Sequence, residues 1–128
     1  EECTKDDLQK IAVLHAETIN EKIKQANKLL FIDTDLNITR SYSLFLFEQA
    51  LETEHWIEEA NKMDICFFLE TDCEYIQDGT RLPESGREAL SIAHKEQLRK
   101  SNVTYLSISG NWEERFQSMI AFINNYVF

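Results

Sequence analysis

Asp33 is the first residue of this sequence whose surroundings suggest chemistry. It follows the apolar run of residues 29–32, and four apolar residues followed by an aspartate form the Walker B pattern. A buried strand of this type presents one carboxylate at its end, where the carboxylate can hold Mg²⁺ through water or polarise a substrate hydroxyl. Aspartates at strand ends also cap the helix that follows, and the sequence leaves this alternative open.

A second group of candidates lies in the polar stretch of residues 70–87, which contains Asp78, Arg81 and Arg87. Two nearby arginines stand out in a chain with 13 basic and 23 acidic residues. Arginine binds phosphate through paired hydrogen bonds and stabilises charge on a transferring phosphoryl group. Because long loops in compact domains are usually functional, we expect residues 70–87 to form a lid over a nucleotide. The alternative is an exposed loop whose arginines pair with nearby acidic residues.

The third candidate site consists of Ser109, Gly110 and Asn111, which follow the apolar run of residues 103–108. A glycine directly after a strand allows backbone groups to approach a planar base, so these residues could form a nucleotide-binding turn. Ser109 and Asn111 are also good helix caps, and this simpler role is the favoured interpretation of the pattern.

The elements that must position these residues are indicated by hydrophobic spacing. Apolar residues recur at helical intervals in five stretches, approximately residues 6–26, 35–47, 52–60, 87–100 and 112–126. Three continuous apolar runs, residues 29–32, 63–69 and 103–108, indicate strands buried on both faces. Strands that alternate with helices predict a parallel sheet between two helical layers, a three-layer α/β fold. Ligands of such sheets bind beyond the carboxyl ends of the strands, where all three candidate sites lie.

Length and composition predict one folded domain over residues 1–128. Hydrophobic residues make up 43% of the sequence, which is enough for a core. Thr4, with Asp7 three positions later, predicts the N-cap of the first helix. The segment of residues 33–35 could cap the second.

Charge and glycine content argue against several classes of function. A net charge of −10 disfavours a nucleic acid or a membrane as the main partner. The three glycines, Gly79, Gly86 and Gly110, cannot form a G-x-G-x-x-G or a Walker A motif, so these residues contain no glycine-rich phosphate loop. An odd number of cysteines and the lack of any long apolar segment predict a soluble cytoplasmic protein.

Two longer motifs resemble those of the NadR-like ribosylnicotinamide kinase group of P-loop proteins. The first reads A-N-K-L-L-F-I-D-T-D over residues 26–35, with Thr39 following, where the family has A-N-x-L-L-F-x-D-T-D. The second reads D-C-E-Y-I-Q-D-G-T-R over residues 72–81, where the family has D-x-[PE]-[WY]-[VI]-x-D-G-x-R. A strand motif at residues 64–69 and the closing segment at residues 108–115 are also similar, so the resemblance covers nearly the whole chain.

The resemblance implies a kinase that uses ATP and Mg²⁺ to phosphorylate a ribose hydroxyl of nicotinamide riboside in NAD salvage. Its catalytic group would be Asp33, Arg81 and Arg87, with Asp33 also near the Mg²⁺ and the two arginines in the lid. Ser109, Gly110 and Asn111 would border the adenine.

The substrate-binding candidates share a position near the end of the first expected strand or in the expected lid. They are Thr34, Asp35, Thr39, Tyr42, Tyr75 and Asp78. By resemblance, Tyr75 would stack on the nicotinamide ring. Tyr42, which also reads as a core residue, could reach a ligand beyond Asp33 through its hydroxyl.

Two departures from the family pattern lead to further expectations. The opening strand and phosphate-binding loop of the family are expected before residue 1, so the chain would be a fragment that does not bind ATP productively alone. A sheet without its central strand would expose its edges, and we expect either a homodimer through such an edge or a rearranged sheet. Glu74 and Tyr75 occupy the positions where the family more often has proline and tryptophan. The aromatic residue is therefore kept, although its ring is of a different type.

Two other functions remain open at the level of sequence. One is a non-catalytic, acidic α/β interaction or regulatory module, which the charge and the absent phosphate loop favour. The other is a P-loop kinase or ATPase of the same group that acts on another substrate.

Overall fold

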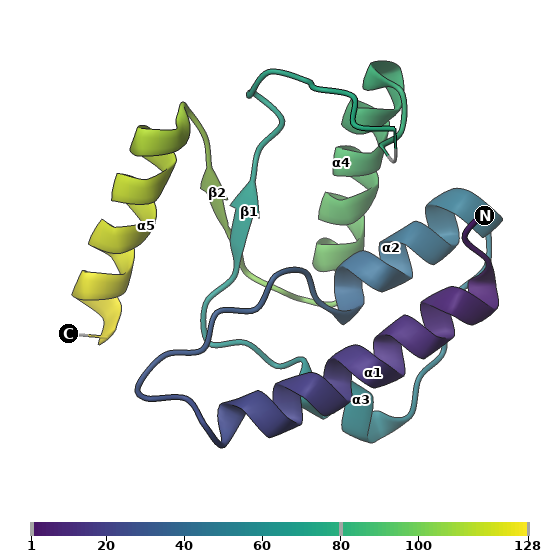
Figure 1. The fold of residues 1–128 in the computed structure, drawn as a ribbon, viewed down its shortest axis with the longest axis horizontal. Helices are drawn as coiled ribbons and strands as arrows, with labels where there is room; N and C mark the ends of the chain where they lie inside the picture. Colours follow the sequence, from purple (N-terminus) through teal and green to yellow (C-terminus); the bar gives the residue numbers. More distant parts are fainter. Residues whose placement is uncertain (1, 80, 128) are drawn as a thin grey trace.

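The computed structural model describes residues 2–79 and 81–127 (Figure 1). Its helices are α1 (Lys5–Ile23), α2 (Leu36–Phe47), α3 (His55–Ala60), α4 (Glu84–Lys100) and α5 (Trp112–Val127), and its strands are β1 (Phe67–Leu69) and β2 (Leu106–Ile108). The five helices expected from hydrophobic spacing are present, and α4 begins at Glu84 rather than at Arg87. These elements confirm an α/β fold.

Helices α1 and α2 begin at the side-chain caps that the sequence predicts. The Thr4 hydroxyl accepts a hydrogen bond from the Asp7 amide (3.2 Å), and the Asp7 carboxylate accepts one from the Thr4 amide (2.9 Å). The Asp35 carboxylate accepts a hydrogen bond from the Ile38 amide (3.2 Å) at the start of α2. Each cap satisfies an amide that the first helical turn leaves unpaired.

The sheet consists, in the described ranges, of β1 and β2, which pair in parallel with Phe67 opposite Leu106. Helix α5 covers one side of this pair and α4 lies on the other (Figure 1). The ring of Phe67 packs edge-on against Phe122 of α5, with 5.8 Å between centroids. The ammonium of Lys95 in α4 lies 5.2 Å from the ring centroid of Phe68. Because successive strand residues point to opposite faces, the two phenylalanines join the sheet to different helices.

The prediction of a third strand at residues 29–32 is wrong. This segment is a loop, and 73% of the Phe31 surface is exposed rather than buried. A strand needs a neighbour for its backbone hydrogen bonds, and neither strand of the described ranges pairs with this segment. The other two strands are shorter than the predicted 63–69 and 103–108, since only three residues of each run are paired.

The hydrophobic core lies mainly among α1, α2 and α3 rather than against the sheet. Its buried residues are Leu8, Ala12, Ala16, Leu36, Leu51 and Ile57. Arg40 connects α2 to α3 and to the loop before α3. Its guanidinium donates to the Thr53 hydroxyl (3.1 Å) and to the Glu58 carboxylate (2.5 Å). Helix α2 also packs along α4. These contacts fix α1, α2 and α4 relative to one another, and the three helices form the walls of a cleft.

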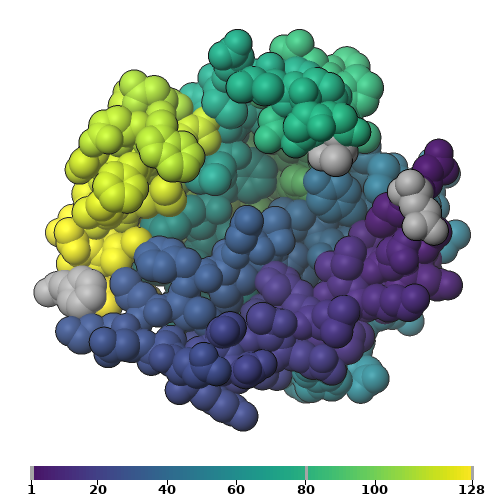
Figure 2. Space-filling model, in the orientation of Figure 1, coloured from purple at the N-terminus to yellow at the C-terminus, as the bar shows by residue number. Residues whose placement is uncertain are grey.

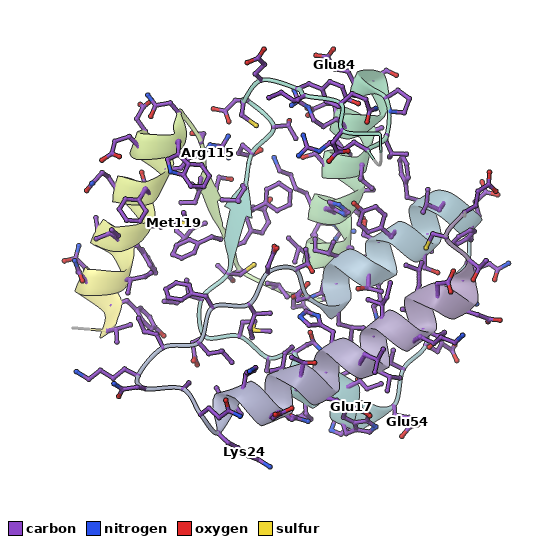
Figure 3. The ribbon with its side chains drawn as sticks, viewed as in Figure 1. Glu17, Lys24, Glu54, Glu84, Arg115 and Met119 are labelled. Carbon is purple, nitrogen blue, oxygen red and sulfur yellow. The ribbon has the colours of Figure 1, made fainter. Side chains whose placement is uncertain are left out.

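The negative charge of the chain is spread over its surface. Glu17, Glu54 and Glu84 lie at the periphery of the molecule and belong to three different parts of the chain (Figure 3). Within the described ranges, no helix combines the length and the apolar character that a lipid bilayer would require of a membrane-spanning segment.

Candidate functional site

A cleft of about 590 Å³ opens between α1, α2, the loop of residues 70–83 and the start of α4. In Figure 2 the teal loop lies above the blue and purple residues of α2 and α1. Six candidate residues from three separate segments line the cleft, and they are Thr34, Thr39, Tyr42, Tyr75, Arg81 and Arg87. Most of the other lining is aliphatic, and no aspartate or glutamate of the described residues is part of it.

The other candidate residues lie outside the lining of this cleft. They are Asp33, Asp35, Asp78, Ser109, Gly110 and Asn111. The structure therefore brings together most of the acceptor and lid candidates. It does not place the expected adenine turn in the same cleft.

The turn of residues 33–35 connects the loop at residues 29–32 to helix α2. Thr34 has a left-handed backbone conformation (φ 62°), and its hydroxyl donates to the Asp33 carbonyl at 2.6 Å. Asp33 is exposed, whereas the Asp35 carboxylate is used as the cap of α2. Thr39 lies one helical turn further on, and its hydroxyl donates to the Asp35 carbonyl (3.3 Å). A β-branched residue rarely adopts a positive φ, and such strained residues cluster at functional sites.

The lid arginines take part in contacts within residues 73–87. Arg81 donates to a loop carbonyl (2.7 Å), and its Nε lies 3.4 Å from the Asp78 carboxylate. Arg87 also donates to a loop carbonyl (2.9 Å), and its guanidinium lies 5.5 Å from the ring centroid of Tyr75. The alternative of local ion pairing is thus confirmed for Arg81 and Asp78. Because a guanidinium has five N–H donors, both arginines keep donors that could bind a phosphate.

The turn after β2 is held by hydrogen bonds within the chain. The Asn111 side chain accepts from the Glu114 amide (2.8 Å), and the Glu114 carboxylate accepts from the Asn111 amide (3.1 Å), so these residues cap α5. The capping interpretation is therefore confirmed for Asn111. Gly110 has a φ of 98°, and its amide donates to the Asp72 carboxylate (2.7 Å). A Cβ at position 110 would lie 3.1 Å from the Glu114 Cβ, so both backbone conformation and space favour glycine.

Arg115 and Asp72 form a polar cluster that sequence patterns did not indicate. Arg115 is only 9% exposed and points from α5 toward the sheet (Figure 3). Its guanidinium donates to the Gly110 carbonyl (2.8 Å), to the Glu70 carbonyl (2.8 Å) and to the Asp72 carboxylate. The Gly110 amide and the Arg115 cation hold the pKa of Asp72 below its ordinary value. The signal in the sequence that could have indicated this cluster is Arg115 itself, a basic residue in a largely apolar helix.

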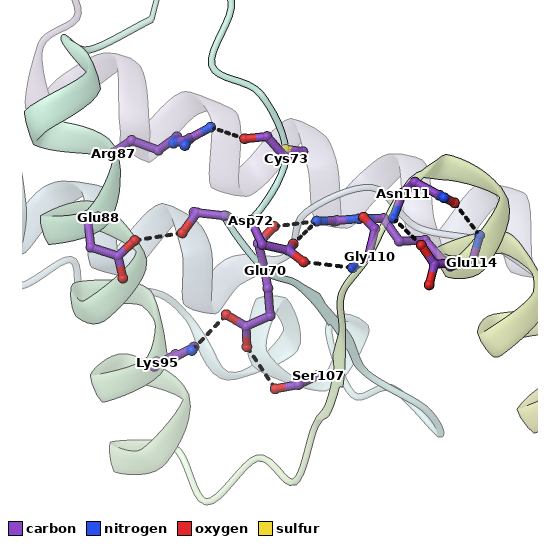
Figure 4. A network of polar contacts seen from close by, with 12 residues as sticks. Glu70, Asp72, Cys73, Arg87, Glu88, Lys95, Ser107, Gly110, Asn111 and Glu114 are labelled. Carbon is purple, nitrogen blue, oxygen red and sulfur yellow. Dashed lines mark hydrogen bonds and ion pairs between the residues drawn. The ribbon is translucent and has the colours of Figure 1, made fainter.

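Glu70 extends this cluster to α4 and β2 (Figure 4). Its carboxylate accepts hydrogen bonds from the Lys95 ammonium (2.8 Å) and from the Ser107 hydroxyl (2.8 Å). The bond from Lys95 is the main reason that the pKa of Glu70 is lowered. The carboxyl ends of both strands, where the expected lid and the expected adenine turn begin, are thereby linked to each other and to two helices.

Asp33 is the candidate that could hold Mg²⁺. The described residues contain no group of three or more His, Cys, Asp or Glu side chains that could hold a metal ion. Mg²⁺ does not require such a group, because it usually keeps several waters and is held by one or two carboxylates and substrate phosphates. A single exposed carboxylate at Asp33 fits this requirement once a nucleotide supplies the phosphates.

Comparison with known proteins identifies the family to which this chain belongs. A family model described as an AAA domain matches residues 2–115, so the chain belongs to this family, which has a P-loop fold. The trifunctional NAD biosynthesis/regulator protein NadR of Salmonella typhimurium is 30% identical over 119 residues, and its counterpart in Escherichia coli is 29% identical over 119 residues. The resemblance to NadR-like proteins is thus confirmed. Each alignment covers 86% of this chain, which spans 28% of the length of these relatives. No solved structure matches the chain.

Proposed function

We propose that this chain is part of an ATP-dependent kinase that resembles nicotinamide riboside kinase and phosphorylates a ribose hydroxyl in NAD salvage. The observation that carries the proposal is the cleft, in which six candidate residues come together from three segments of the chain. The similarity to two NadR proteins, whose name includes NAD biosynthesis, supports this choice of substrate.

The cleft has the chemistry of a nucleoside-binding site. Its aliphatic and aromatic walls suit a base, and Tyr75 offers a ring for stacking. The hydroxyls of Thr34, Thr39 and Tyr42 can exchange hydrogen bonds with a ribose. In this acidic chain the lining contains cationic Arg81 but no described carboxylate, which favours the approach of a phosphoryl group.

Phosphoryl transfer would depend on Asp33 and the lid arginines. The Asp33 carboxylate, exposed beside Thr34, would accept a hydrogen bond from the attacking hydroxyl and orient it. Mg²⁺, when bound, would neutralise charge on the phosphates. Arg81 and Arg87 would stabilise the transferring group, and Asp78 would hold Arg81 in place.

The nucleotide side of the site is the less complete part of the proposal. Ser109, Gly110 and Asn111 would border the adenine. A Walker A motif does not occur in these 128 residues, so we expect the chain alone to bind the acceptor but not to bind ATP productively. In the complete enzyme, β1 and β2 would belong to a three-layer parallel sheet, and the enzyme would act in the cytoplasm, where ATP is available.

The test is a phosphorylation assay with the natural gene product, ATP, Mg²⁺ and nicotinamide riboside, with nicotinamide mononucleotide quantified by mass spectrometry. We expect turnover, and we expect Asp33→Asn to lower kcat by at least about 100-fold because the oriented carboxylate is lost. Asp6→Asn, which removes an exposed carboxylate on α1, is the matched control and should keep full activity. Wild-type activity in Asp33→Asn would remove Asp33 from the mechanism, and no turnover of this or any other nucleoside would end the proposal.

A second candidate function is an acidic, non-catalytic interaction module. The net charge of −10 and the internal bonding of the Gly110 amide favour it. Isothermal calorimetry with the acceptor and with Mg-ATP separates the two functions. An interaction module should bind neither ligand, whereas the kinase proposal requires the 128-residue chain to bind the acceptor. A panel of other nucleosides identifies a kinase of the same group with another substrate.

A further inference from the structure

Gln77 has no part in the expected site, yet its side chain makes three hydrogen bonds within the lid. Its Nε2 donates to the Tyr75 hydroxyl oxygen (2.7 Å) and to the Arg81 carbonyl (3.1 Å), and its Oε1 accepts from the Gly79 amide (2.9 Å). Gln77 is exposed, so burial does not impose these bonds. An exposed amide that uses both ends on one short loop keeps that loop in one conformation.

The Tyr75 hydroxyl closes the same loop from its other side. It donates to the Leu82 carbonyl (2.5 Å), seven residues away, while it accepts the bond from Gln77. Tyr75, Arg81 and Leu82 all line the cleft. The hydrogen bonds of one hydroxyl and one amide therefore determine how three lining residues are presented.

The polar part of Tyr75 is what distinguishes it from other aromatic residues at this position. Phenylalanine offers a ring without a donor, and tryptophan offers only an indole N–H, which donates but does not accept. Neither could donate to the Leu82 carbonyl and accept from Gln77 at one oxygen atom. Tyr75 thus combines a ring for the cleft with a hydroxyl for the loop.

We propose that Gln77 and the Tyr75 hydroxyl are positioning groups that order residues 75–79 and 81–82 over the cleft before any ligand binds. The inference rests on the proposed function for the identity of the acceptor, whereas the order of the loop is a property of the chain itself. A loop that is already ordered does not lose that conformational entropy when the ligand binds, so binding is tighter. Neither group touches the reacting atoms, and both act through the ring of Tyr75 and the backbone carbonyls of Arg81 and Leu82.

The first experiment measures the order of the loop without any ligand. Hydrogen–deuterium exchange of the 128-residue chain is compared for wild type, Gln77→Leu and Tyr75→Phe. We expect peptides from residues 75–82 to exchange at least about threefold faster in both variants, because each lost hydrogen bond favours the open loop. Gln117→Leu is the matched control, since it removes another exposed glutamine whose amide is hydrogen-bonded, to Glu113 of α5. It should leave exchange of the loop unchanged, and thermal midpoints should agree among all forms.

The second experiment measures KM for the acceptor, KM for ATP and kcat in the natural gene product. We expect KM for nicotinamide riboside to rise about three- to tenfold in each variant, while kcat and KM for ATP stay within about twofold. The double variant should raise KM by less than the product of the two single effects, because one of the lost hydrogen bonds is shared by the two groups.

The outcomes separate this proposal from the proposed function. Unchanged exchange in both variants overturns the positioning role even in an active kinase. Faster exchange with an unchanged KM for the acceptor overturns it as well, because the ordered loop would then not serve binding. If the wild-type protein phosphorylates no nucleoside, the proposed function fails, and the exchange result alone decides whether Gln77 orders the loop.

Discussion

At the scale of single residues, the buried cation Arg115 organises the ends of both strands. It binds one carbonyl after each strand and the carboxylate of Asp72, and it does so from the first turn of α5. Most of the candidates taken from sequence motifs lie in turns and loops, where chemistry is usually found, whereas Thr39, Tyr42 and Arg87 lie in helices. Arg115 is not one of these candidates. It stabilises the residues from which the expected lid and the turn at Gly110 begin.

Replacing Arg115 should therefore destabilise the fold. Arg115→Met would leave the Glu70 and Gly110 carbonyls without their donor, and we expect the free energy of unfolding to fall by about 2 kcal/mol or more. Urea denaturation followed by circular dichroism measures the change. Arg99→Met, which removes an exposed arginine paired with Glu96, should have no measurable effect. Equal effects of the two substitutions would contradict a special role for Arg115.

His94 should make the stability of the chain depend on pH. Its Nδ1 lies 2.8 Å from the Ser41 hydroxyl oxygen, and its ring packs edge-on to Tyr42. Burial lowers the pKa of His94 from 6.5 to about 4. Between these values the unfolded chain binds a proton that the folded chain does not, so stability decreases as the pH falls through this window.

The test compares denaturation at pH 7 and pH 4.5. His94→Gln cannot be protonated, and we expect it to lose about 1 kcal/mol less stability over this range than wild type, allowing for partial exposure. His55→Gln is the control, since the His55 side chain is 80% exposed, and it should keep the wild-type pH dependence. The same pH dependence in wild type and His94→Gln would show that other groups determine it.

At the scale of elements, local sequence signals predicted the starts of helices correctly, whereas the strand pairing of residues 29–32 was predicted wrongly. The starts of α1, α2 and α5 are capped by side chains within three residues of the amides that they bind. Such caps depend only on neighbouring residues and can be recognised from sequence. Residues 29–32 have the composition of a buried strand, but forming a strand depends on a partner elsewhere in the chain.

The cap of α2 gives a prediction that separates stability from catalysis. Asp35→Ala removes the acceptor for the Ile38 amide and should lower the free energy of unfolding by about 1 kcal/mol. Asp35→Asn keeps a capping oxygen and should stay close to wild type. Thermal denaturation of both variants tests this, and equal losses would show that the cap does not stabilise the helix. Lost kinase activity in a fully stable Asp35→Asn would assign the carboxylate to acceptor binding.

At the scale of the whole molecule, apolar residues remain exposed around the small sheet. The exposed fractions are 73% for Phe31, 56% for Leu69 and 85% for Trp112. Exposed apolar patches commonly mark interaction surfaces, and unpaired strand edges can bind further strands. Both features favour association of two copies of the chain.

We predict that the chain forms a homodimer through the apolar surface that contains Phe31, Leu69 and Trp112. Light scattering over a range of concentrations should give twice the monomer mass, and Phe31→Lys should shift the equilibrium to monomer by placing a charge in the contact. Ile92→Lys is the matched control, because Ile92 is 62% exposed on α4. A monomer at every concentration in wild type, or equal dissociation in the two variants, would contradict the prediction.

The amino-acid sequence by itself determined the helices, the caps of α1, α2 and α5, and the motifs that indicate an NadR-like protein. These features depend on periodicity and on bonds between residues a few positions apart, such as Asn111 with Glu114. Only the tertiary structure decided that Thr34, Tyr42 and Arg81 share one cleft and that residues 29–32 are not paired. It also decided the roles of distant partners, such as Arg115 and the Glu70 carbonyl, which are 45 residues apart. The physical reason is that strand pairing, burial and clefts arise where separate segments meet, and no local pattern encodes that meeting.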